Sequence, residues 1–154
     1  MNGTVKELKA NEQAPQGFLK IPFYPDIAAS AGGGCVNGEC EAKNIKFITV
    51  DASTISFKNE KSLFAIKASG DSMSGIILDG ALLICDREQR KFKHNDIFVV
   101  TVYGDTFVKT LRKGKADEAV ILHSFNHLYG EDEVPTSAVD IVAKVIQVHN
   151  KHNL

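Results

Sequence analysis

A serine and a lysine are the residues of this 154-residue sequence best suited to do chemistry together. Ser72 lies in the segment Gly70-Asp71-Ser72-Met73, and Lys109 follows further along the chain. A serine hydroxyl is a weak nucleophile until a base removes its proton, and lysine can act as that base only when neutral. Val108 and Leu111 flank the lysine, and apolar surroundings lower a lysine pKa because burial disfavours the charged form. The two residues therefore predict a Ser-Lys catalytic pair.

The segments around this pair have patterns typical of β-strands. An apolar run at 63–68 leads directly into Ser72, which would place the nucleophile at the end of a rigid strand. The runs 97–103 and 106–111 predict a hairpin with Lys109 on its second strand. Further strands are expected at 81–85, 119–123 and 139–148, and 45–50 is either a strand or a short helix. We therefore expect a mainly β fold, a twisted antiparallel assembly with little helix.

Several motifs occur in an order that resembles the self-cleaving peptidase domain of LexA and phage repressors. They are Ser69-Gly70-Asp71-Ser72-Met73, Asp79-Gly80, Val108-Lys109-Thr110-Leu111, Leu122, Ser124, Asn126 and Tyr129. In that family the serine attacks the protein's own backbone and the lysine is the general base. The resemblance gives these roles to Ser72 and Lys109, whose separation also matches the family, and it implies a LexA and signal-peptidase-like fold. It extends over roughly residues 18–149.

The resemblance also implies an oxyanion site and has three departures. The backbone N–H groups of Asp71 and Ser72 would stabilise the oxyanion. Gly75 stands where the family usually has proline, Ala81 where it usually has aspartate, and Ala143 where it often has glycine. None of the three removes a catalytic group, so they bear on the rate of cleavage more than on its chemistry.

A run of small residues upstream is the expected substrate. Residues 28–34 are alanine, serine and glycine, and such a backbone can bend into a narrow active site because glycine tolerates strained dihedral angles. The resemblance places the cut between Ala31 and Gly32, in a cleavage loop of about residues 28–40. On composition alone, the same run also fits a flexible linker without chemistry.

The chain divides into an arm and one domain. Residues 1–17 are polar, with a short hint of helix at 5–8, and are expected to be a linker or N-terminal arm. Residues 18–154 are expected to form the autopeptidase and dimerisation domain, beginning with an apolar stretch at 18–27 whose two prolines favour short edge strands. Repressors of the resembled family carry a helix-turn-helix domain ahead of such a linker. We therefore expect either a fragment of a longer repressor or a short UmuD-like relative.

The charge and hydropathy of the chain limit which binding partners are expected. The formal net charge is -1 and the basic residues are scattered, so operator DNA is expected to bind only through the absent helix-turn-helix domain. No apolar run approaches the ~20 residues of a membrane helix and no signal peptide opens the chain, so a cytoplasmic protein without membrane contact is expected. The resemblance implies a homodimer and an activated RecA filament that promotes cleavage. The run 139–148 would then be either a dimer-interface strand or a core strand.

Cysteines and histidines add no competing site. The cysteines are expected to be free thiols, since no second ligand pair of zinc spacing follows the first two, and neither a metal nor a cofactor is predicted. They are Cys35, Cys40 and Cys85. His123 and His127, with the acidic pair Glu131-Asp132, are a rival source of acid-base chemistry, but they lack a nucleophile motif.

We therefore interpret the sequence as the autoproteolytic domain of a LexA-like or prophage repressor, which inactivates repression by cutting its own Ala31-Gly32 bond. Three alternatives stay open. A UmuD-like subunit would cut itself to remodel a translesion polymerase. A non-cleaving dimerisation module would keep the fold without the chemistry. A signal-peptidase-like enzyme shares the Ser-Lys chemistry but needs a membrane anchor, against which the absence of an apolar span argues.

Overall fold

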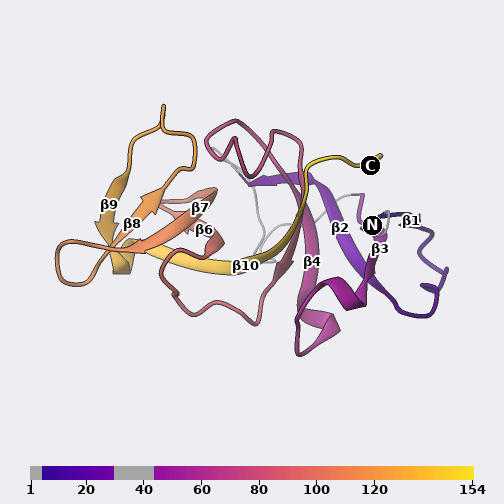
Figure 1. Ribbon diagram of the computed structural model, residues 1–154. Coiled ribbons are helices and arrows are strands. Elements are labelled where there is room, and N and C mark those ends of the chain that lie inside the picture. Colours follow the sequence, from indigo (N-terminus) through magenta and orange to yellow (C-terminus); the bar gives the residue numbers. More distant parts are fainter. Residues whose placement is uncertain (1–4, 30–43) are drawn as a thin grey trace.

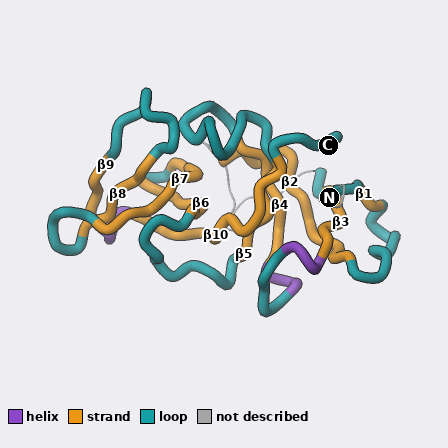
Figure 2. The backbone as a smooth tube through the Cα atoms, in the orientation of Figure 1, coloured by secondary structure: helices purple, strands orange, loops and turns teal. Residues whose placement is uncertain are grey.

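A single mixed β-sheet accounts for most of the regular structure in the computed structural model, which describes residues 5–29 and 44–154. The described residues form a 10-stranded sheet with the order β1-β3-β2-β4-β5-β10-β6-β7-β8-β9. Helical structure in these residues is limited to short 3-10 turns, which Figure 2 shows in purple. The mainly β class expected from the sequence is confirmed.

The strands are numbered in the order in which they occur along the chain. Their bounds are β1 (Glu7–Leu8), β2 (Phe18–Ala29), β3 (Lys46–Asp51), β4 (Leu63–Ala68), β5 (Leu82–Asp86), β6 (Ile97–Val102), β7 (Asp105–Lys113), β8 (Ala119–His123), β9 (Asp132–Pro135) and β10 (Val139–His149). The 3-10 turns are η1 (Ala52–Thr54), η2 (Glu60–Ser62) and η3 (Thr136–Ala138).

Strand β10 links the two halves of the sheet. Its first half pairs with β6 and its second half with β5, and Lys144 is paired on both sides. Figure 1 shows this long strand, in yellow, running from the β6–β9 half toward the half that contains β2 and β4. Strand β7, which carries Lys109, and strand β4, which leads to Ser72, therefore belong to different halves, which β10 and β5 join.

The β6–β7 hairpin expected from the sequence is present, with its turn one residue earlier than the gap between the predicted runs 97–103 and 106–111. Tyr103 and Gly104 form its tip with φ angles of 50° and 86°. Positive φ at both central residues is the requirement of a type I′ turn, whose twist matches that of the flanking strands. The turn sets the register that pairs Phe98 with Lys109.

Strand β2 differs from the expected short edge strands. It is a 12-residue strand inside the sheet, antiparallel to β3 and parallel to β4. The pairing with β4 jumps from Phe23↔Ala65 to Ala28↔Lys67, so Pro25 falls in an irregular stretch where the ladder needs no N–H donor. The β2–β4 pair is also the parallel exception in a sheet that was expected to be antiparallel.

Two short strands were not expected at all. Residues 5–8, which hinted at helix, instead contribute β1, where Glu7 pairs with Ile48. Val5 and Leu8 are buried against the sheet, so tertiary packing overrides the local pattern. Strand β9 is charged and lies at the edge of the sheet, where polar side chains face water and leave no apolar alternation to read.

The turn at residues 69–81 is called the nucleophile turn here after the role predicted for Ser72, and an apolar core joins it to strand β7. Met73 and Ile77 from the turn pack in one buried cluster with Val108 of β7. Ala81 and Ala143, two of the family departures, are fully buried in the same cluster. These departures therefore alter packing and bring no polar group to the site.

The described part of the chain contains no helix of the length and apolarity needed to cross a membrane. Cys35 and Cys40 lie outside the described residues. Cys85 is a buried free thiol on β5, and burial raises its pKa because the thiolate is disfavoured away from water.

Candidate active site

Ser72 lies on a closed turn between β4 and β5. Ala68 N donates to Ala81 O and Gly80 N donates to Ala68 O, each at 2.8 Å. These two hydrogen bonds close the base of the turn. Within it, Gly70 has a φ of 88°, a left-handed conformation that favours glycine, and its N–H donates to Asp79 Oδ1 at 2.9 Å. Three residues that carry the resemblance, Gly70, Asp79 and Gly80, therefore stabilise the turn that presents Ser72.

The segment 124–129, which follows β8, braces this turn from outside. Asn126 N donates to Ser72 O at 2.9 Å, and Asn126 Nδ2 donates to Asp71 O at 3.0 Å. The Tyr129 hydroxyl donates to the Asp71 carboxylate. Phe125 N contacts Met73 Sδ at 3.4 Å. The carbonyl groups on both sides of the nucleophile are therefore held in place.

The backbone N–H groups of Asp71 and Ser72 remain available within the described part of the chain. Neither Asp71 N nor Ser72 N donates a hydrogen bond to another described residue. Free backbone donors beside a nucleophile are what an oxyanion site requires. The arrangement therefore suits the oxyanion role predicted for Asp71 and Ser72.

Lys109 projects from β7 into partly buried surroundings. Its Nζ donates to Ser124 Oγ at 2.7 Å and lies 5.8 Å from the centre of the Phe107 ring. Burial lowers the pKa of Lys109 because the ammonium is poorly solvated there, and the carboxylate of Asp132 acts in the opposite direction. Val108 and Leu111 are both buried as expected, but Val108 packs in a different apolar cluster from Leu111 and Phe107, the aromatic residue near the amine.

Ser72 and Lys109 both contact the segment 124–129. Ser124 holds the lysine amine and Asn126, two residues later, holds the backbone of Ser72. Among the described residues the side-chain hydrogen bond of Lys109 goes to Ser124, and Ser72 and Lys109 do not hydrogen-bond to each other. One short segment therefore contacts both residues, and the catalytic role of each stays a prediction.

The predicted bond Ala31-Gly32 lies outside the described residues. The strand that leads toward it is described. Ala28 pairs with Lys67 and Ala29 pairs with Ala68, in parallel. Because β4 runs directly into the turn of Ser72, the end of β2 lies beside the approach to the nucleophile.

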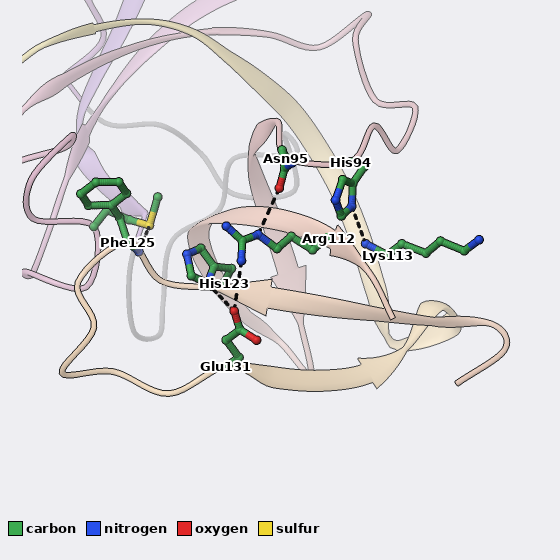
Figure 3. Close-up of polar contacts among 8 residues, drawn as sticks. His94, Asn95, Arg112, Lys113, His123, Phe125 and Glu131 are labelled. Atoms are coloured by element: carbon green, nitrogen blue, oxygen red, sulfur yellow. Dashed lines mark hydrogen bonds and ion pairs between the residues drawn. The ribbon is translucent and has the colours of Figure 1, made fainter. Parts of the chain in front are cut away.

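The rival histidine cluster is a surface ion-pair network. Glu131 Oε1 lies 2.7 Å from His123 Nδ1 and 3.3 Å from Arg112 Nη1, and Arg112 Nε donates to Asn95 Oδ1 at 3.1 Å. Figure 3 shows His123 and Arg112 both pointing toward Glu131. His127 is exposed. The contacts described for this network include no serine or cysteine, and in the described ranges no three metal-ligating side chains cluster together.

The departure at Gly75 has a structural counterpart. Gly75 has a φ of 112°, and a Cβ built there would lie 2.4 Å from Cε1 of Phe125. The ring of Phe125 therefore occupies space that a side chain would need. A glycine in place of the family's proline lets the segment 124–129 pack directly on the nucleophile turn.

Sequence reasoning missed the supports on the far side of the turn. Asn150 Oδ1 accepts from Leu78 N at 2.8 Å, and Asn150 Nδ2 donates to Ile76 O at 3.1 Å. His152 Nε2 donates to Gly80 O at 2.7 Å. These polar residues follow the last strand without any motif, so only their side-chain contacts reveal them. The role of Ser124 was missed too, although Ser124 carries part of the resemblance.

Asn126→Ala is expected to loosen the nucleophile turn. It removes the bond to Asp71 O, so we expect a stability loss of about 1 kcal/mol and a several-fold slower self-cleavage. Thermal unfolding and cleavage rate measure the two effects. Asn59→Ala is the matched control because its side chain accepts from Lys61 N on η2, away from the turn. An unchanged cleavage rate in Asn126→Ala would show that the brace is not needed.

Comparison with known proteins agrees with this geometry. The family model Peptidase S24-like matches residues 22–146, a range that contains Ser72, Lys109 and the segment 124–129. The repressor protein CI of Enterobacteria phage phi80 is 25% identical over 145 residues, which are 93% of this chain and 61% of that relative. The chain therefore spans less than two thirds of the repressor's length. Because the family model covers most of the sequence, the chain belongs to the Peptidase S24-like family.

Proposed function

We propose that this chain is the self-cleaving domain of a LexA-like or prophage repressor and that it cuts its own Ala31-Gly32 bond. The observation that carries the proposal is the parallel pairing of Ala29 with Ala68. Ala29 is two residues before the proposed bond and Ala68 is four residues before Ser72. Strands β2 and β4 run in the same direction, so the proposed substrate segment and the segment that leads to Ser72 approach the site side by side.

The chemistry follows from the residues at the turn. Ser72 Oγ attacks the carbonyl carbon of Ala31 as neutral Lys109 removes the hydroxyl proton. The N–H groups of Asp71 and Ser72 stabilise the oxyanion of the tetrahedral intermediate. As the Ala31–Gly32 bond breaks, Lys109 returns the proton to the Gly32 amine. Water then hydrolyses the Ala31–Ser72 ester, again with Lys109 as base, which leaves Ala31 with a free carboxylate.

A tethered substrate makes conformation the natural point of control. A well-oriented intramolecular reaction has an effective molarity of roughly 10⁵–10⁸ M, so affinity for the substrate is not limiting. In this proposal an activated RecA filament favours the conformation in which the bond meets Ser72. Operator binding belongs to a separate helix-turn-helix domain.

The proposal includes a homodimer through this domain. Residues Val139–Ile141 of β10 pair with β6, and Val148 and His149 pair with β5. Among the described residues, the first half of β10 therefore pairs along one edge with β6, and the second half pairs along the opposite edge with β5. In this proposal a second copy pairs with the part of β10 that neither β5 nor β6 covers.

A direct test is the mass of the purified protein after incubation at high pH. Wild type is expected to yield residues 1–31 and 32–154. Gly32→Glu is expected to stay intact and folded, because a bulky charged side chain at the bond does not fit against Ser72. Intact mass and thermal unfolding of both proteins measure this. Cleavage of Gly32→Glu at the same bond and the wild-type rate would show that the bond is assigned wrongly.

A second candidate function is a dimerisation module that does not cleave. The observation in its favour is that Lys109 hydrogen-bonds to Ser124 and not to Ser72 among the described residues. An unchanged wild-type mass after long incubation at high pH would support this candidate over self-cleavage.

A further inference from the structure

Ser124 is a buried residue to which the proposed mechanism gives no task. It is the first residue after β8, and only 4% of its surface is exposed. Its hydroxyl oxygen accepts from Lys109 Nζ at 2.7 Å. A short bond between a half-buried amine and a buried hydroxyl is specific, because water does not compete well for either group there.

The surroundings of Ser124 are fixed by contacts to the nucleophile turn. The next residue, Phe125, contacts Met73 Sδ through its N–H, and the one after, Asn126, contacts the carbonyls of Asp71 and Ser72. Lysine carries its amine on a flexible four-carbon stem. The bond to Ser124 therefore ties a mobile group to the same backbone segment that holds Ser72.

We propose that Ser124 is the positioning residue of Lys109, holding the amine in the orientation that proton transfer from Ser72 requires. This inference rests on the proposed self-cleavage. Ser124 acts through Lys109 and not on the reacting atoms.

The donor inventory of lysine explains the role. A neutral amine has two N–H groups and one lone pair, and the lone pair must face the Ser72 hydroxyl to accept its proton. When an N–H donates to Ser124 Oγ, the lone pair is turned away from Ser124 and is free for another partner. After proton transfer the ammonium has three N–H groups, and the one that faces Ser124 becomes a stronger, charge-assisted bond.

Two other groups near the lysine do not supply this orientation. The carboxylate of Asp132 on β9 acts on Lys109 through its charge. The ring of Phe107 faces Nζ from the same strand at 5.8 Å and offers no directional acceptor. Among the described residues, the hydrogen bond of the amine therefore depends on Ser124.

Cleavage rate against pH, measured for Ser124→Ala and Ser124→Thr, tests the inference. At high pH Lys109 is fully neutral and the cleavage rate reaches its plateau. In Ser124→Ala this plateau rate is expected to fall at least about tenfold, because the amine is no longer held in the orientation needed for proton transfer. The midpoint of the rise is expected to move to lower pH, because the ammonium loses an acceptor. Ser124→Thr keeps the hydroxyl and is expected to recover most of the rate.

Ser62→Ala is the matched control. Ser62 is also buried, at 8% exposed, but its hydroxyl donates to Asp86 Oδ1 at 2.6 Å. This variant is expected to lower the melting temperature and leave the plateau and midpoint unchanged. A Ser124→Ala protein that behaves in the same way has lost only stability, and that result would overturn the inference.

The failure of the inference and that of the proposed function are distinguishable. If wild type does not cut itself at any pH, with or without an activated RecA filament, self-cleavage is wrong. The contact is then tested alone by an NMR titration of the Lys109 side chain in wild type and Ser124→Ala. A lower Lys109 pKa in the variant supports the positioning contact, and equal pKa values in the two proteins overturn it.

Discussion

Ser72→Ala is expected to abolish self-cleavage and leave the fold intact. Without the hydroxyl no ester with Ala31 can form, so the loss should be complete on the timescale of the wild-type reaction. The Ser72 side chain is only partly buried and makes no hydrogen bond to another described residue. Its removal should therefore change the free energy of unfolding by no more than about 0.5 kcal/mol. Intact mass after incubation at high pH and thermal unfolding measure the two quantities.

Ser74→Ala is the control for this variant. Ser74 lies on the same turn, is also partly buried, and keeps its backbone bond from N to Asp71 O whatever its side chain. It is expected to cut itself at the wild-type rate. If Ser72→Ala still yields the two fragments, the nucleophile is a different group and the Ser-Lys assignment is wrong.

Lys109→Ala is expected to slow self-cleavage by about 10²–10⁴-fold, the usual contribution of a positioned general base. The pH dependence of the wild type tests the same role. Only the neutral amine can accept a proton, so the rate should rise with pH and level off above the pKa of Lys109. Burial lowers that pKa below the ~10.4 of a free lysine, so the plateau should begin at a lower pH than an exposed lysine would give.

The matched control is Lys113→Ala. Lys113 ends the same strand and is exposed, so its truncation to alanine removes only a surface charge. We expect the wild-type rate and pH profile. A histidine base such as His123 would instead give a rise centred near ~6.5 and leave Lys109→Ala active. A Lys109→Ala protein with the wild-type profile would exclude the lysine as base.

The sequence alone determined the elements whose signals are local. Strand β4, the β6–β7 hairpin and strand β8 were predictable because apolar side chains recur along them and turn residues separate them. The roles proposed for Ser72 and Lys109 also come from the sequence, because their motifs have an order and separation that resemble a known family. Residue types and spacing are sufficient for such inferences, since they require no knowledge of what lies across the fold.

Contacts between distant parts of the chain were decided only by the tertiary structure. The prolines of β2 pointed to a sheet edge, yet the strand lies between β3 and β4 because an irregular register accommodates Pro25. Ser124 became the partner of Lys109 because β7 and β8 pair side by side. A polar side chain can bond to any group within about 3 Å, and which group comes that near depends on packing between strands and not on local pattern. For the same reason the resemblance singled out Asn126 as a motif residue but did not reveal its hydrogen bonds to Asp71 and Ser72.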